Sequence, residues 1–172
     1  MRVLCYLSSA SVLFLLVALL EPVIARDEEG SSSRLVVLDA YWAEVSRSVR
    51  EGDFEGYKST CHEDGVLVSG AKKSSVPLTV ALARWKQGFM DTKAGKIKAD
   101  VEFRFSQRFG DETTAHETGI FLYSTVDQEG LRKQEHVHFQ ALLVKQKGEW
   151  KIMMEYQRSK GTVVEWNALS AK

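Results

Sequence analysis

The chain has 172 residues, which suits one ordinary domain with a short appendage. Hydrophobic residues make up 44% of it and charged residues 27%, a balance typical of a globular protein and unlike that of a disordered or collagen-like chain. Because 23 Lys and Arg are offset by 23 Asp and Glu, there is no basic excess to drive sequence-independent binding to nucleic acid. We therefore expect no nucleic-acid partner.

Residues 1–25 have the pattern of a signal peptide. Arg2 provides a positive head, residues 10–20 form an uninterrupted apolar run, and residues 23–25 (Val-Ile-Ala) resemble a cleavage site. The apolar run is too short to cross a bilayer of about 30 Å as a helix. We expect a secreted or periplasmic protein with no stable membrane insertion after cleavage; an uncleaved anchor is the alternative.

The first part of the mature chain predicts helices. Residues 26–33 are polar and predict a flexible lead-in. Apolar residues at helical spacing then predict an amphipathic helix over residues 34–50, which Gly52 ends. Asp53 is placed to cap a second, short helix that runs to about Cys61.

A short strand and a third helix follow. Residues 66–68 are an apolar run that predicts the strand, and Pro77 stands where it can open a helix that Gly95 ends. After cleavage the chain would keep only Cys61, so no internal disulfide is expected. A buried structural thiol is the preferred interpretation of this cysteine, over a nucleophile.

From Ile97 onward, apolar and polar residues alternate with period two, and turn-forming residues divide the sequence into four long strands. This arrangement is typical of an antiparallel meander. Residues 161–172 form a tail in which Trp166 is expected to pack against the body. The predicted class is α+β, with helices on one face of a curved sheet.

The domain over residues 34–160 carries loose motifs of a known superfamily. They are Gly52-Asp53, the Glu63-Asp64 pair before the short strand, and the Gly-x-Trp entry to the last strand at Gly148–Trp150. With these motifs the chain resembles the nuclear transport factor 2-like superfamily, and within it the SnoaL-like and ketosteroid isomerase-like small domains. Its last strand, through Arg158-Ser159 and Gly161, is similar to the end of the calcium/calmodulin-dependent protein kinase II association domain.

The resemblance implies a cone-shaped, curved antiparallel sheet that wraps around three N-terminal helices and encloses a pocket. It also implies dimers or larger rings. Function transfers poorly, because this scaffold hosts isomerases, cyclases, dehydratases and non-catalytic binders. Where ketosteroid isomerases place a general-base Asp and an oxyanion-donating Tyr, this chain has Ser69 and a position near Val45, so that isomerisation is not expected.

Alternation sorts the meander into an apolar face, which we expect to be concave and covered by helices, and a polar outer face. Polar side chains also stand on the predicted apolar face, namely Glu117, Tyr123, Glu135, Tyr156 and Arg158. Burying charged groups without a partner is costly, so we interpret this cluster as the polar end of a small-molecule site. An internal salt bridge or charges at an open rim are the alternatives.

The predicted ligand-binding residues combine polar and aromatic side chains from the helices and the sheet: Trp42, Trp85, Phe103, Glu117, Tyr123, Tyr156 and Arg158. Arg158 is expected to hold an anionic or carbonyl group of the ligand, and Glu117 is the candidate catalytic acid or base. If the last strand is shifted by one residue, Gln157 faces the pocket instead of Arg158.

The predicted outer face carries a possible set of zinc or iron ligands: His116, His136, His138 and Glu155. The match is only the two-residue step between His136 and His138, on a face rich in Lys, Gln and Glu. A solvated face or a polar interface is therefore preferred. We expect no metal and no cofactor, and a homodimer formed through this face.

The sequence leaves three functions open. The leading interpretation is an exported domain that binds a small, mostly apolar molecule with one polar or anionic group. The second is a SnoaL-like enzyme that catalyses proton transfer of the isomerase, cyclase or dehydratase type, with Glu117 as base and Tyr123 or Tyr156 as hydrogen-bond donor. The third is a non-catalytic dimerisation module.

We predict that the mature protein begins at or near Arg26. The apolar run should direct export, and a signal peptidase should then cut after Ala25. N-terminal sequencing of protein recovered from the envelope or medium of its host checks this. An intact Met1 terminus in the membrane fraction would contradict it.

Overall fold

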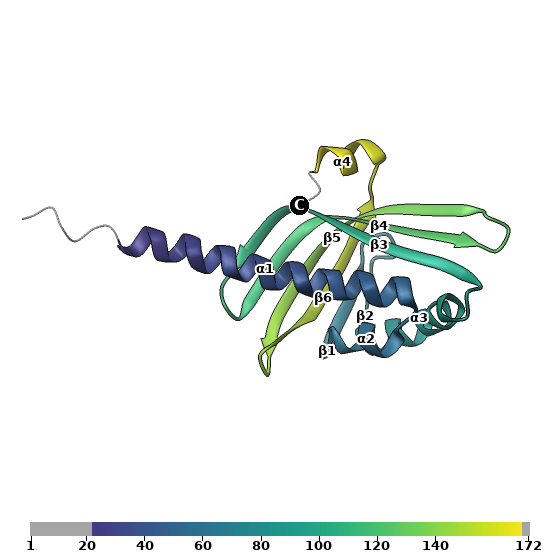
Figure 1. Cartoon of the computed structure of the whole chain (residues 1–172), viewed down its shortest axis with the longest axis horizontal. Helices are drawn as coiled ribbons and strands as arrows, with labels where there is room; N and C mark the ends of the chain where they lie inside the picture. Colours follow the sequence, from purple (N-terminus) through teal and green to yellow (C-terminus); the bar gives the residue numbers. More distant parts are fainter. Residues whose placement is uncertain (1–21, 170–172) are drawn as a thin grey trace, which may run out of the picture.

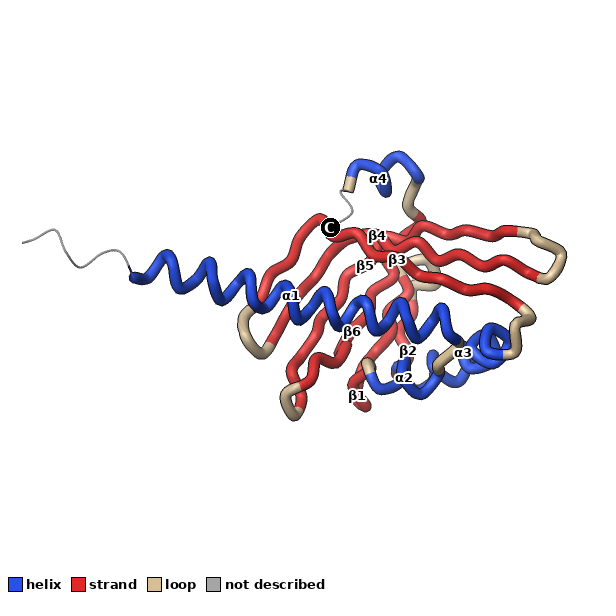
Figure 2. Tube along the Cα trace, viewed as in Figure 1, coloured by secondary structure: helices blue, strands red, loops and turns tan. Residues whose placement is uncertain are grey.

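The computed structural model describes residues 22–169, so the predicted signal peptide lies mostly outside the described residues. Within that range the chain forms four helices and six strands (Figure 1 and Figure 2). In chain order they are α1 (Pro22–Glu51), α2 (Phe54–Ser59), β1 (Cys61–Ser69), β2 (Ser74–Pro77), α3 (Leu78–Lys93), β3 (Ile97–Gly110), β4 (Thr114–Asp127), β5 (Arg132–Gln146), β6 (Glu149–Lys160) and α4 (Val163–Ala168).

The strands belong to one curved sheet in the order β2-β1-β6-β5-β4-β3. Strands β3 to β6 form the predicted antiparallel meander, whereas β1 pairs with β6 in parallel, so the sheet is mixed rather than wholly antiparallel. Helix α1 lies across the concave face with α2 and α3 beside it, and α4 lies on the opposite side of the sheet (Figure 1). The predicted α+β class, with a curled sheet around N-terminal helices, is confirmed.

Helix α1 begins earlier than the sequence pattern predicts. It starts at Pro22 and runs through residues 26–33, the expected flexible lead-in. Proline fits the first helical turn because its missing N–H needs no partner there. The helix ends before Gly52, which has a φ of +66° and where an added Cβ would lie 2.4 Å from the Lys93 nitrogen. Glycine permits both this turn and the close approach to the end of α3.

Side-chain caps fix the starts of α2 and α4. Asp53 Oδ1 accepts a hydrogen bond from the Gly56 nitrogen at 2.9 Å, as predicted for the N-cap of α2. Thr162 and Glu165 form a reciprocal capping box at the start of α4, a helix that the sequence pattern does not predict. Strand β2 is also absent from the sequence prediction, because Pro77 ends it and directly precedes α3.

Trp166 anchors α4 to the outer face of the sheet and is only 5% exposed, as predicted for the tail. The Arg104 guanidinium lies 4.2 Å from the centre of the indole and donates to the Trp166 carbonyl oxygen at 2.9 Å. His136 packs against the indole, and His138 Nε2 lies 3.2 Å from Glu165 Oε1. These two histidines therefore help to seat α4 on the sheet.

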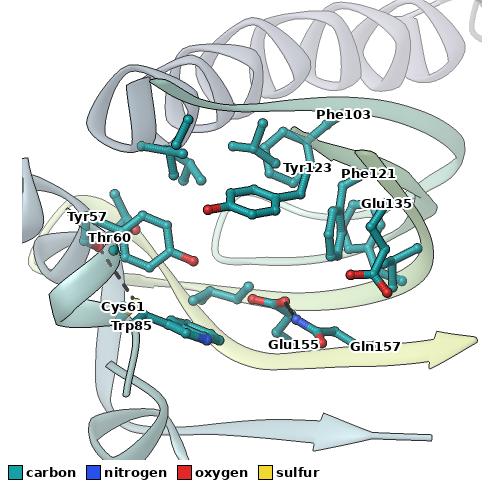
Figure 3. A pocket seen from close by; sticks show the side chains of 18 of the residues that line it. Tyr57, Thr60, Cys61, Trp85, Phe103, Phe121, Tyr123, Glu135, Glu155 and Gln157 are labelled. Atoms are coloured by element: carbon teal, nitrogen blue, oxygen red, sulfur yellow. Dashed lines mark hydrogen bonds between the residues drawn. The ribbon is translucent and has the colours of Figure 1, made fainter. Parts of the chain in front are cut away.

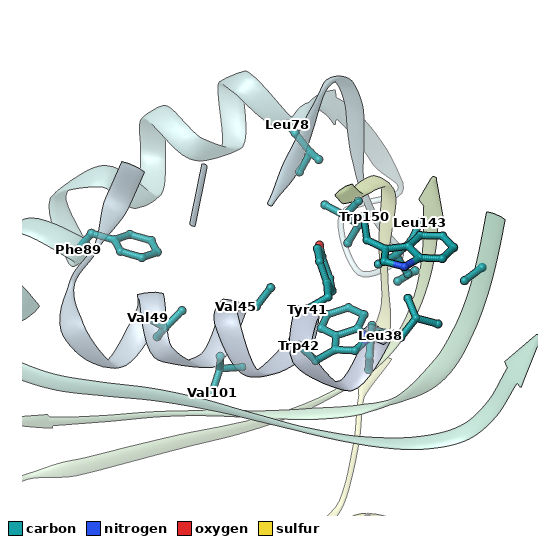
Figure 4. Packing of buried hydrophobic residues seen from close by; sticks show 14 of the residues in the cluster. Leu38, Tyr41, Trp42, Val45, Val49, Leu78, Phe89, Val101, Leu143 and Trp150 are labelled. Carbon is teal, nitrogen blue, oxygen red and sulfur yellow. The ribbon is translucent and has the colours of Figure 1, made fainter. Parts of the chain in front are cut away.

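The hydrophobic core fills the space between α1 and the concave face (Figure 4). Trp42 of α1 is at its centre, with ring centroids 4.4 Å from Phe103 and 5.7 Å from Phe139. The small side chains of Ala115 and Ala141 are fully buried and let the helix approach the sheet closely. The apolar face that alternation predicts for β3, β4 and β5 is confirmed by this packing.

A charged pair is buried inside this core. Glu117 is fully buried and accepts hydrogen bonds from Arg108 Nε at 2.5 Å and from the Trp42 indole nitrogen. The Arg108 side chain is 5% exposed and also pairs with Asp39 of α1. A bulge at Ser106 in β3 turns Arg108 toward the core, so that its guanidinium meets Glu117 on the neighbouring strand.

Replacing Arg108 with Met should lower the free energy of unfolding by about 3–5 kcal/mol, because Glu117 would be left as an uncompensated buried charge. Adding Glu117→Leu to the same chain should recover most of that loss, since no unpaired charge would remain in the core. Urea denaturation followed by circular dichroism measures both changes. Equal stability of the single and double variants would contradict the pairing.

Candidate functional site

Next to the filled end of the core, the helices and the sheet enclose a cavity of about 520 Å³. Its walls come from α1, α2 and α3 and from the concave faces of β3, β4, β5 and β6 (Figure 3). Most of the wall is apolar or aromatic, including Val45, Trp85, Phe89, Val101, Phe121 and Ile152. Small-molecule sites typically have volumes of about 300–1,000 Å³, so this cavity has the size of such a site.

Some of the predicted ligand-binding residues lie in the cavity wall, and others do not. Trp42, Trp85, Phe103 and Tyr123 line the cavity. Glu117 does not, because it lies at the closed end of the core with its oxygens held by Arg108 and Trp42. Its assignment as a catalytic base is therefore corrected: this carboxylate is a structural partner in an ion pair.

Tyr156 and Arg158 do not line the cavity either, because β6 carries a bulge that alternation alone does not predict. The register between β5 and β6 shifts around Met153, an extra residue, which reverses the alternation as far as Gln157, and it shifts again around Arg158. Glu155 and Gln157 consequently face the cavity, which is the one-residue shift that the sequence left open for Gln157. Tyr156 faces outward, and Arg158 is exposed.

Glu155 is the polar centre of the cavity (Figure 3). Its Oε1 accepts a hydrogen bond from Gln157 Nε2 at 2.7 Å, and no cation of the described residues acts on it as a partner. Burial raises the pKa of this carboxyl group above its usual range, and the hydrogen bond from Gln157 only partly opposes the effect. Glu155 is therefore more easily protonated than an exposed glutamate.

Hydroxyl groups share the cavity with Glu155. The side chains of Tyr57 and Tyr123 extend into it with their hydroxyls toward the interior (Figure 3). Burial raises the pKa of Tyr57 well above its usual value, and the charge of Glu155 adds to the effect, so the phenol stays a hydrogen-bond donor. Burial also raises the pKa of the Cys61 thiol to about 12, which argues against a thiolate nucleophile at neutral pH.

The histidines of the outer face do not form a metal centre with Glu155. Glu155 faces the cavity, whereas His136 and His138 contact α4 on the other side of the sheet. Within the described part of the chain, no three His, Cys, Asp or Glu side chains come together as metal ligands would. In the same range, no helix is both long and apolar enough to cross a membrane.

Sequence reasoning missed Glu155 and Tyr57 as cavity residues and gave Gln157 only as an alternative to Arg158. Strict alternation assigns Glu155 and Gln157 to the outer face, and only the bulge turns them inward. Tyr57 lies on α2, whose 6 residues are too few for a periodic pattern to reveal the inner side of the helix. One signal was available: Met153 and Met154 are consecutive apolar residues that interrupt the alternation just before Glu155.

The sequence model of the calcium/calmodulin dependent protein kinase II association domain family matches residues 38–161. No curated protein sequence shows a significant match. Three solved structures illustrate the shared fold. A ketosteroid isomerase-like protein from Erwinia carotovora is 16% identical, with a TM-score of 0.54 over 74% of this chain and 96% of that one.

ActVI-ORFA from Streptomyces coelicolor is also 16% identical, with a TM-score of 0.57 over 72% of this chain and 95% of that one. An NTF-2-like protein of unknown function from Shewanella oneidensis is 15% identical, with a TM-score of 0.55 over 72% and 97% of the two chains. At these identities the structures show the fold, which is that of the nuclear transport factor 2-like superfamily. Because the family model spans most of the chain, this protein belongs to the calcium/calmodulin dependent protein kinase II association domain family.

Proposed function

We propose that this domain binds a small, mostly apolar molecule in the cavity and holds one polar group of that molecule at Glu155. A single combination carries the proposal: an apolar cavity of about 520 Å³ with a carboxyl group that has no cationic partner among the described residues. A buried polar group that is incompletely paired is costly, and a ligand can supply the missing interaction.

The position of Glu155 changes the group that the ligand should present at the centre of the cavity. Arg158, expected from the sequence to hold an anion there, is exposed, and a carboxyl group stands at the polar centre. Both protonation states of a carboxyl group accept hydrogen bonds, so a hydroxyl or an amine of the ligand suits this position. The phenols of Tyr57 and Tyr123 can donate hydrogen bonds to a carbonyl oxygen of the same ligand.

Proton-transfer catalysis is a second candidate function. The raised pKa of Glu155 favours it, because a carboxyl group that titrates nearer to neutral pH is a better general acid or base. Tyr57 and Tyr123 would then stabilise an oxyanion by donating hydrogen bonds. Relative to the expectation from sequence, the base moves from Glu117 to Glu155, and Tyr57 takes the place of Tyr156.

We further propose that the domain acts after export and as a homodimer. The signal pattern of residues 1–25 supports export, and the mixed polar and apolar outer face of the sheet supports association. Helix α4 occupies part of that face. Ile120 lies between Arg104 and His138, which both contact α4, and is 2% exposed. A dimer through this face would have to pack around α4.

Native mass spectrometry of the protein purified from its own host should detect a retained small molecule. Glu155→Gln should weaken its retention while the fold is kept, because the amide has nearly the same shape but accepts a hydrogen bond less strongly than a carboxylate does. Glu102→Gln, an exposed change in β3, is the matched control and should retain the molecule. Wild-type protein that carries no added mass and binds no apolar probe would contradict the proposal.

The two candidate functions differ in what happens to the retained molecule. Deuterium exchange into one of its carbon positions, catalysed by the wild type in heavy water and lost in Glu155→Gln, would favour catalysis. Release of the molecule without any exchange would favour binding alone.

The raised pKa of Glu155 also makes the free energy of unfolding depend on pH. In the folded protein its pKa is raised above the reference value of 4.5, so the folded state holds the proton more tightly than the unfolded state does. The carboxyl group therefore favours folding most below pH 4.5, and this contribution is lost as the pH rises through the raised pKa.

Glu155→Gln should remove this pH dependence. As the pH rises from about 4 to about 8, the Tm of the wild type should fall relative to that of the variant. Differential scanning calorimetry in matched buffers measures the difference. Glu63→Gln, an exposed change in β1, should follow the wild type. Parallel curves for the wild type and Glu155→Gln would show that burial does not perturb this carboxyl group.

A further inference from the structure

A second, smaller cavity adjoins the first. It has a volume of about 170 Å³ and lies between β1, β2 and the first turns of α3. Ser69, Arg84, Trp85 and Gln157 line both cavities, so the two spaces meet along these side chains. A ligand that fills the main cavity would have to pass between these side chains to place one end in the smaller one.

The smaller cavity differs from the main one in charge. Its lining includes two cationic side chains, Lys72 and Arg84, and the hydroxyls of Ser69 and Ser74, and none of its lining residues is acidic. In the described part of the chain, the side chains of Lys72 and Arg84 form no ion pair or hydrogen bond with another residue. The main cavity adds a further cation, Lys160, to its wall.

Two unpaired cations that line one small space repel each other, and an anion between them removes that repulsion. Both side chains are exposed, so water and salt weaken each interaction. The smaller cavity differs from an ordinary charged surface because these two cations and two hydroxyl groups line the same space. Arg84 also offers a planar set of donors, which matches the geometry of a carboxylate.

We propose that the ligand is an amphiphile whose carboxylate lies in the smaller cavity between Lys72 and Arg84, while its apolar body fills the main cavity. This inference rests on the proposed function and deepens it by naming the chemical class of the ligand. The ligand's polar group at Glu155 and its carboxylate are then bound at two separate places. Gln157 lies between them, since it donates to Glu155 and lines the smaller cavity.

Isothermal titration calorimetry with decanoate and 1-decanol tests this, because the two probes share an apolar chain and differ in charge. At low salt, decanoate should bind about fivefold more tightly than 1-decanol. The advantage should shrink at about 0.5 M NaCl, since exposed charges are screened there. The double variant Lys72→Gln with Arg84→Gln should bind decanoate no more tightly than 1-decanol.

Arg132→Gln with Lys133→Gln is the matched control, because it removes the same two charges at exposed positions of β5 that line neither cavity. This control should keep the advantage of decanoate. Equal binding of the two probes to the wild type, or an advantage that survives in the Lys72 and Arg84 variant, would overturn the anion site and leave the proposed function standing. If neither probe binds, the proposed function fails and the anion site fails with it.

Discussion

A carboxylate that is fully buried between a helix and a sheet needs donors, and Glu117 takes them from Arg108 of β3 and Trp42 of α1. Arg108 also pairs with Asp39, so α1 is tied to the sheet by two side chains almost one turn apart. These contacts of Trp42 and Asp39 set the distance between α1 and the strands β3 and β4. At this end of α1, aromatic side chains fill the space between the helix and the sheet. Farther along the helix, Val45 and its neighbours line the cavity.

Two carboxyl groups, one fully buried and one partly buried, thus lie on the inner side of one sheet and have different roles. Glu117 has a guanidinium and an indole N–H as donors, so its charge is neutralised within the protein. Glu155 has only the amide of Gln157 as a donor, although two cationic side chains, Arg84 and Lys160, line the same cavity. The environment of each group, rather than its residue type, makes Glu117 a partner in an ion pair and leaves Glu155 for the ligand that we propose.

Periodicity predicted the long helix and the antiparallel meander because burial repeats regularly along α1 and β3 to β5. The same regularity placed Trp42 and Phe103 at the cavity. The cap at Asp53 was predictable because it depends on one local hydrogen bond. The bulges at Ser106 and Met153 were not, since an extra residue in a strand changes the register without changing the composition. The positions of Glu155 and Gln157 in the cavity depend on the bulge at Met153, and the pair between Arg108 and Glu117 depends on the bulge at Ser106.

The extra residue at Met153 decides which side chains in the middle of β6 face the cavity. If Met153 took a regular place in the pairing, Glu155 would turn outward, and Met154 and Tyr156 would face inward in its place. Loss of the Met153 codon would remove the bulge but leave Glu155 opposite Ala141, so the strand would become regular while the cavity kept its carboxyl group. The carboxyl group is therefore held in the cavity by its pairing with β5, and not by its distance along the chain from the start of β6.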